Sequence, residues 1–158
     1  YDPRTKVLRL SPDVYGKASL ASVGVAAHEA GHALQDSRGY TPLKLRSALV
    51  PAAQLGSNLA WPLLFLGMFL GVMGMVKLGV IFFSGAVLFQ VVTLPVEFNA
   101  SARAMRALEG VGILSGDELS GARRVLSAAA LTYVAAAVTA VLQLLYFLLR
   151  SGLLGGDD

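Results

Sequence analysis

The stretch LAWPLLFLGMFLGVMGMVKLGVIFFSGAVLFQVV, residues 59–92, contains one charged side chain, Lys77. It lies within a longer segment, residues 48–96, in which Lys77 is again the only charge, and residues 125–149 contain none. About 20 apolar residues suffice for a helix to cross a hydrocarbon core about 30 Å thick. These runs therefore predict membrane spans at about 55–76, 78–96 and 125–149, with Lys77 at the turn between the first two.

The composition supports a membrane protein. Of the 158 residues, 55% are hydrophobic and 15% are charged, whereas about 25% are charged in an ordinary soluble domain. We predict a mainly α-helical, integral membrane protein of one domain, residues 1–158, with about three transmembrane helices. Basic residues are not interleaved with aromatic ones, which argues against nucleic-acid binding. The chain has no cysteine, so disulfides and thiolate metal ligands are excluded.

The basic residues predict a topology. Most of them lie in two polar segments, residues 1–47 and 97–124. The positive-inside rule places both segments in the cytoplasm, with the Lys77 turn and the C-terminal tail outside. The hairpin of spans within residues 48–96 returns the chain to its starting side. Residues near 28–47 and near 97–106 should therefore meet at one membrane face.

The first polar segment contains the stretch AHEAGHAL, residues 27–34, which holds the only two histidines of the chain. Ser19 is a good N-cap for a helix from Leu20 to about Asp36, with Gly39 as its stop. Polar and apolar residues alternate weakly over Lys6–Leu10, which predicts a short strand there. On that helix His28 and His32 lie four residues apart on one face. Both imidazoles can then reach one Zn²⁺.

Glu29 gives this HExxH motif its catalytic group. Its position is rotated about 100° from that of His28 around the helix, so it is poorly placed as a third ligand. It is well placed to take a proton from a zinc-bound water that attacks a carbonyl. The motif therefore predicts a catalytic zinc site with Glu29 as the general base.

A catalytic zinc needs a third protein ligand, and no other histidine exists. Glu97 is the first charge after the second span, and a carboxylate at the membrane boundary is costly without a partner. An ordinary interfacial glutamate at a helix N-terminus is the alternative. Because the HExxH helix is expected at the same membrane face, we favour Glu97 as the ligand.

Arg103 and Arg106 follow Glu97 one turn apart. They are candidates for stabilising the oxyanion or binding a substrate carboxylate. Juxtamembrane arginines that only set the topology are the alternative.

The stretches HEAGHALQ and LPVEFNASARAMRAL, with the two-span hairpin between them, resemble the bacterial neutral zinc metallopeptidases of the YugP type, which are membrane-bound gluzincins. YDPRTKVLRLSPDVY and RGYTPLKLRSALVPAAQLGS extend the resemblance over most of the chain. It implies a zincin-like site with ligands His28, His32 and Glu97 and with Glu29 as catalytic base. It also implies a bacterial cytoplasmic membrane and an N-terminal membrane helix before Tyr1.

The sequence departs from the related HtpX-type proteases at one position. There an aspartate four residues after the ligand glutamate supports a histidine, whereas this chain has Ser101. Asn99 or Ser101 is a candidate for that supporting role.

We therefore expect a zinc-dependent endopeptidase that cuts peptides or membrane proteins at the cytosolic face of the bilayer, with Glu29 activating a zinc-bound water. The alternative is a zinc-binding membrane scaffold or regulatory partner without hydrolytic activity. Homo-oligomers and regulatory membrane partners are left open by the sequence.

Overall fold

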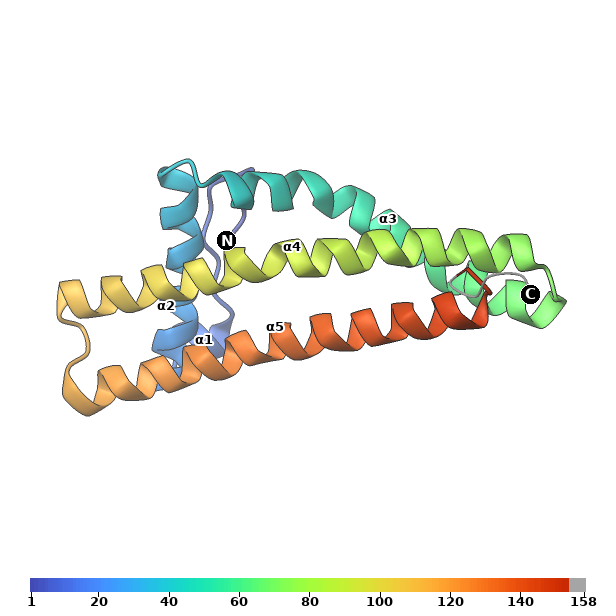
Figure 1. The fold of residues 1–158 in the computed structure, drawn as a ribbon. Coiled ribbons are helices and arrows are strands. Elements are labelled where there is room, and N and C mark those ends of the chain that lie inside the picture. Colours follow the sequence, from blue (N-terminus) through green and yellow to red (C-terminus); the bar gives the residue numbers. More distant parts are fainter. Residues whose placement is uncertain (154–158) are drawn as a thin grey trace. The chain divides into compact units, whose positions relative to one another are not determined.

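The structure, a computed structural model, describes residues 1–153, and it is helical almost throughout (Figure 1). The helices are α1 (Pro12–Tyr15), α2 (Leu20–Ser37), α3 (Thr41–Leu70), α4 (Met73–Val111) and α5 (Gly116–Arg150). Helices α3, α4 and α5 are long and apolar enough to cross a membrane. The prediction of a mainly α-helical protein with three such helices is confirmed.

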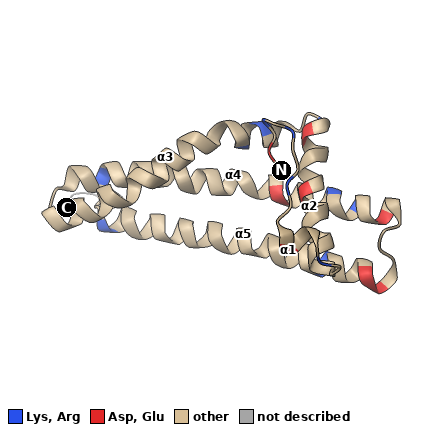
Figure 2. Cartoon of the chain, turned by 180° about the vertical axis from the view of Figure 1, so that it is seen from behind, with Lys and Arg blue, Asp and Glu red and all other residues tan. Residues whose placement is uncertain are grey.

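The chain forms two compact units, each built from two separate segments. Unit 1 consists of Tyr1–Ser47 and Thr93–Tyr133, and unit 2 of Ala48–Val92 and the chain from Val134 onward. Charged side chains gather on the segments of unit 1 (Figure 2). Among the described residues of unit 2, only Lys77 and Arg150 carry a charge.

Unit 2 packs around aromatic rings. Trp61 of α3 lies with its ring centroid 5.6 Å from that of Phe83 in α4 and 6.0 Å from that of Phe147 in α5. Leu64 and Val80 are also buried in this cluster. The aromatic and aliphatic side chains of α3, α4 and α5 thus form one hydrophobic cluster in unit 2.

The turn between α3 and α4 lies six residues earlier than predicted. Gly71 adopts φ +69°, a left-handed conformation that glycine reaches at little cost. The N–H of Val72 then donates to the carbonyl of Gly67 at 2.9 Å, the capping bond of a Schellman motif. The prediction that Lys77 lies at the turn is wrong, because α4 begins at Met73 and contains Lys77.

Helix α2 of unit 1 begins where its cap predicts. The hydroxyl of Ser19 accepts a hydrogen bond from the N–H of Ser22 at 3.1 Å, which satisfies a backbone donor that has no partner within the helix. The helix ends at Ser37, and Gly39 follows with φ +64°. The predicted helix from Leu20 is confirmed and is one residue longer than expected.

The predicted strand at Lys6–Leu10 does not form. Within residues 1–153 its only pairing is an isolated bridge between Asp2 and Val7. Lys6 has φ +55°, and the carboxylate of Asp2 accepts hydrogen bonds from the Arg4 N–H and the Thr5 hydroxyl. A tight turn that closes on itself leaves no extended segment to pair with a neighbour.

Candidate metal centre

Helices α2 and α4 bring three candidate ligands together inside unit 1. His28, His32 and Glu97 each offer one ligand atom, and these atoms lie within 4.8 Å of one another. Glu97 Oε2 is 3.0 Å from His28 Nε2 and 3.6 Å from His32 Nε2. Two ligands of a tetrahedral zinc with bonds of about 2.0–2.2 Å lie about 3.4 Å apart. The two distances from Glu97 Oε2 are close to this value, and two imidazole nitrogens with one carboxylate oxygen are a donor set that suits Zn²⁺.

Gly31, inside the HExxH motif, explains how the two helices approach so closely. It lies against the backbone of Ala100, and a Cβ atom on Gly31 would overlap the Ala100 carbonyl oxygen and lie 3.2 Å from Ala100 Cα. Ala100 is fully buried. It follows Glu97 by three residues, so the small pair at the helix crossing sets the separation between the histidines and the carboxylate.

We expect Gly31→Ala to separate α2 from α4 and to weaken zinc binding more than 10-fold. Inserting one methyl into a packed crossing also destabilises the fold, by about 1–3 kcal/mol. Zinc content and thermal unfolding of the purified protein measure the two effects. Gly110→Ala is the matched control, because nothing lies within 4 Å of a Cβ placed there. Unchanged zinc affinity in Gly31→Ala would show that the crossing does not set the site.

Burial makes Glu97 the electrostatic centre of the site. Its side chain is 2% exposed, and a buried carboxylate is strongly destabilising unless cationic groups or hydrogen bonds compensate it. The two imidazoles face Oε2, whereas Arg46 Nη1 of α3 lies 3.1 Å from Oε1. Oε1 has no directed hydrogen bond, so the Arg46 contact is ionic. Each oxygen of Glu97 thus faces a different partner.

Both histidines are held through their Nδ1 atoms. His28 Nδ1 lies 3.1 Å from the hydroxyl of Ser101, and His32 Nδ1 lies 3.0 Å from Gln35 Oε1. The buried Gln35 amide donates its N–H groups to the Val96 carbonyl at 2.8 Å and to Asn99 Oδ1 at 3.1 Å. Its Oε1 can only accept, so His32 carries its proton on Nδ1 and leaves Nε2 free for a metal.

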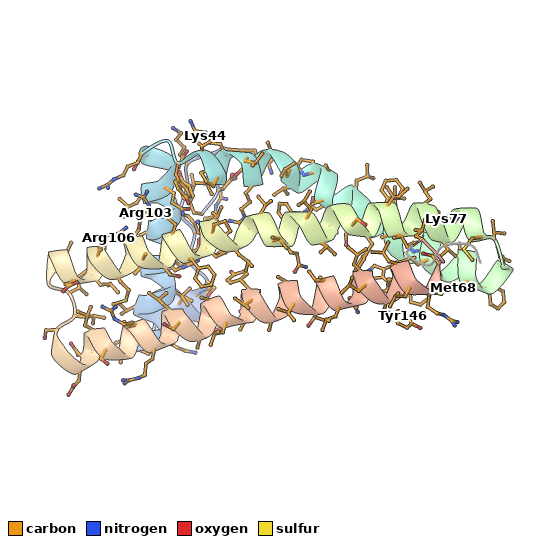
Figure 3. The ribbon with its side chains drawn as sticks, viewed as in Figure 1. Lys44, Met68, Lys77, Arg103, Arg106 and Tyr146 are labelled. Carbon is orange, nitrogen blue, oxygen red and sulfur yellow. The ribbon has the colours of Figure 1, made fainter. Side chains whose placement is uncertain are left out.

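The remaining candidate residues lie at different distances from the ligands. Ser101 contacts His28 directly, and Asn99 is one hydrogen bond further away, through Gln35. Arg103 Nε donates to Asn99 Oδ1 at 2.7 Å, and its guanidinium lies over the Tyr40 ring. Arg106, labelled next to Arg103 in Figure 3, lines a cavity between α4 and α5.

The sequence did not predict three residues that lie near the candidate ligands, namely Gln35, Arg46 and Tyr133. Tyr133 of α5 interacts electrostatically with Glu97, Arg46 and Glu29. Only Gln35 had a recognisable signal, since it is a polar residue three positions after His32 and therefore adjacent on the helix surface. Arg46 was counted among the residues that set the topology.

Glu29 lies beside the ligands without joining them. Its side chain is 28% exposed. The Tyr1 hydroxyl donates to Asp36 Oδ2 at 2.7 Å. This hydrogen bond, with burial and the carboxylate charge, raises the pKa of Tyr1 to about 12. Asp36 thus holds the Tyr1 side chain against α2.

A family described as "Putative neutral zinc metallopeptidase" matches residues 1–152. The chain belongs to this family. The similarity that the sequence suggested to the neutral zinc metallopeptidases is therefore confirmed, and the family description agrees with a donor set that fits zinc.

A curated relative supports the same assignment. The "Putative membrane protease YugP" of Bacillus subtilis (strain 168) is 49% identical over 150 residues, which cover 94% of this chain and 66% of that protein. The chain thus spans slightly less than two thirds of its relative. No solved structure matches. The relative's description and the three long apolar helices among the described residues together indicate that this chain is membrane-associated.

Proposed function

We propose that the chain is a zinc-dependent endopeptidase of the bacterial cytoplasmic membrane. The observation that carries the proposal is the convergence of His28, His32 and Glu97, with the carboxylate of Glu29 next to the first ligand. A site that only stabilises the fold needs no partly exposed carboxylate at that position. Membership of a family described as zinc metallopeptidases supports the same chemistry.

His28, His32 and Glu97 would hold the metal through two nitrogens and one oxygen. A bound Zn²⁺ supplies Lewis acidity, because it polarises a carbonyl and lowers the pKa of water. Glu29 takes a proton from the attacking water and returns it to the leaving amine. The water oxygen bonds to the carbonyl carbon, the C–N bond breaks, and a carboxylate and an amine are formed.

Arg46 is a positioning residue in this mechanism. Its guanidinium is 3.1 Å from Glu97 Oε1, which leaves Oε2 directed at the two histidines. Glu97 therefore offers the metal one oxygen.

The site would face the cytoplasm. All of its residues lie in unit 1, whose segments carry most of the basic side chains (Figure 2). By the positive-inside rule such segments stay on the cytoplasmic side. We expect substrates with extended segments near the membrane surface.

Metal removal tests the proposal directly. The full chain, purified in detergent, is expected to contain about one zinc per molecule and to cleave unstructured peptides. Removal of zinc by 1,10-phenanthroline should reduce cleavage more than 100-fold, and added Zn²⁺ should restore it. Mass spectrometry of the products measures the reaction and locates the cut bond. Equal cleavage by chain shown to be free of metal would refute a zinc mechanism.

A further inference from the structure

A second feature of unit 1 lies beside the metal centre. A cavity of about 530 Å³ opens between α4 and α5, within the size range of ligand-binding pockets. Its apolar lining includes Phe98 and Met105 of α4 and Leu126 and Leu131 of α5. Met105 and Leu126 are buried, whereas Phe98 and Leu131 are 47% and 65% exposed. The cavity therefore has a buried floor and an open, apolar mouth.

Ser101 connects this cavity to the ligands. Its side chain lines the cavity, and its hydroxyl is 3.1 Å from His28 Nδ1. Phe98, at the same end of the cavity, directly follows Glu97 in the chain. A molecule in the cavity would thus begin next to the metal centre.

The other end of the cavity is charged. Arg106 and Glu109 of α4 and Arg123 of α5 line it there. Within residues 1–153, neither arginine forms an ion pair with an acidic side chain. Two arginines and one glutamate line this end, so it carries a net positive charge. It suits an acidic group of a ligand.

We infer that the cavity is a substrate pocket, which takes a large apolar side chain next to the scissile bond and an acidic side chain further along the peptide. The inference rests on the proposed function, since it specifies the substrate of the same site. Ser101 and Arg106 are five residues apart on α4, about 7.5 Å along the helix at about 1.5 Å per residue. An extended peptide advances about 3.3 Å per residue, so the acidic residue follows the apolar one by about two positions.

Peptide binding tests the pocket separately from catalysis. The probe is a set of fluorescent peptides with Leu or Gly at the apolar position and Asp or Lys two residues later. They are titrated into zinc-loaded Glu29→Gln, and fluorescence anisotropy gives the dissociation constants. Leu should bind at least 10-fold more tightly than Gly, as expected for burial of one large apolar side chain, and Asp more tightly than Lys.

Variants locate the preference in the cavity. Ala102→Trp, which places an indole in the cavity, should reduce the Leu-over-Gly ratio to less than 3-fold. Ala128→Trp is the matched control, because Ala128 is exposed on α5 and does not line the cavity. Arg106→Gln should reduce only the Asp-over-Lys ratio. Arg106 is exposed, so this substitution should not disturb the fold. Arg106→Gln therefore tests the charged end even if Ala102→Trp fails to fold.

The outcomes separate the pocket from the enzyme. Equal affinities for Leu and Gly peptides, or an unchanged ratio in Ala102→Trp, would overturn the pocket. Displacement by a single-chain phospholipid without any peptide preference would also overturn it and assign the cavity to lipid. If wild type binds the peptides with the expected preference but does not cut them, the pocket stands and the endopeptidase proposal fails. If wild type cuts the peptides but binds them without the expected preference, the endopeptidase proposal stands and the pocket is refuted.

Discussion

Glu29→Gln is expected to lower peptide hydrolysis about 10²–10⁴-fold, the usual contribution of a positioned general base, and to leave zinc content unchanged. The amide has nearly the same shape as the carboxylate but cannot accept the proton of the attacking water. The substitution leaves the candidate ligands His28, His32 and Glu97 in place, because Glu29 is not one of them. Single-turnover cleavage and metal analysis of the same preparation measure both quantities.

Asp36→Asn is the matched control for this variant. Glu29 and Asp36 are carboxylates seven residues apart on α2. If the role of Glu29 were only to place a negative charge on this helix, the two variants would lose activity to a similar extent. A general base predicts a large loss in Glu29→Gln and less than about a 3-fold change in Asp36→Asn. Full activity in Glu29→Gln would refute its catalytic role.

Glu97→Ala is expected to weaken zinc binding by more than the 10–100-fold loss that follows removal of a supporting partner. It removes a ligand and leaves Arg46 without its counter-charge beside the two histidines. Like-charge repulsion between that guanidinium and the metal adds to the loss. Competition with a chromophoric chelator gives the affinity, and circular dichroism checks that the helices remain.

The control for Glu97 is another glutamate of unit 1. Glu118 of α5 is exposed, and Glu118→Ala should bind zinc as wild type does. Glu97→Asp keeps the charge on a side chain one methylene shorter, so its affinity should lie between those of Glu97→Ala and wild type. Zinc bound by Glu97→Ala with unchanged affinity would remove Glu97 from the proposed ligand set.

Capping signals located the ends of α2. Ser19 and Gly39 bracket α2 as expected, because capping requirements are local. The turn at Gly71 was misplaced, since residues 55–96 are apolar on both sides of it. There Lys77 was the only visible interruption, and a single lysine is compatible with a helix interior.

Part of the candidate site could also be predicted from local sequence patterns. The spacing of His28 and His32 follows from helix geometry alone, and Glu97 was reached by excluding other ligand types. Arg46 and Tyr133 approach from α3 and α5, and no local pattern reports a contact between distant segments. The sequence also did not predict the role of Gly31, because that role depends on the close contact between Gly31 in α2 and Ala100 in α4.

The division of unit 1 into two segments of the chain has a consequence for biosynthesis. The ligand pair His28 and Glu97 is separated by 69 residues, and residues 48–92 of the other unit are made in between. A ribosome therefore releases both histidines well before the carboxylate. The complete candidate donor set exists only after the intervening hairpin and Glu97 have been synthesised, so a shorter nascent chain holds the two histidines without the carboxylate.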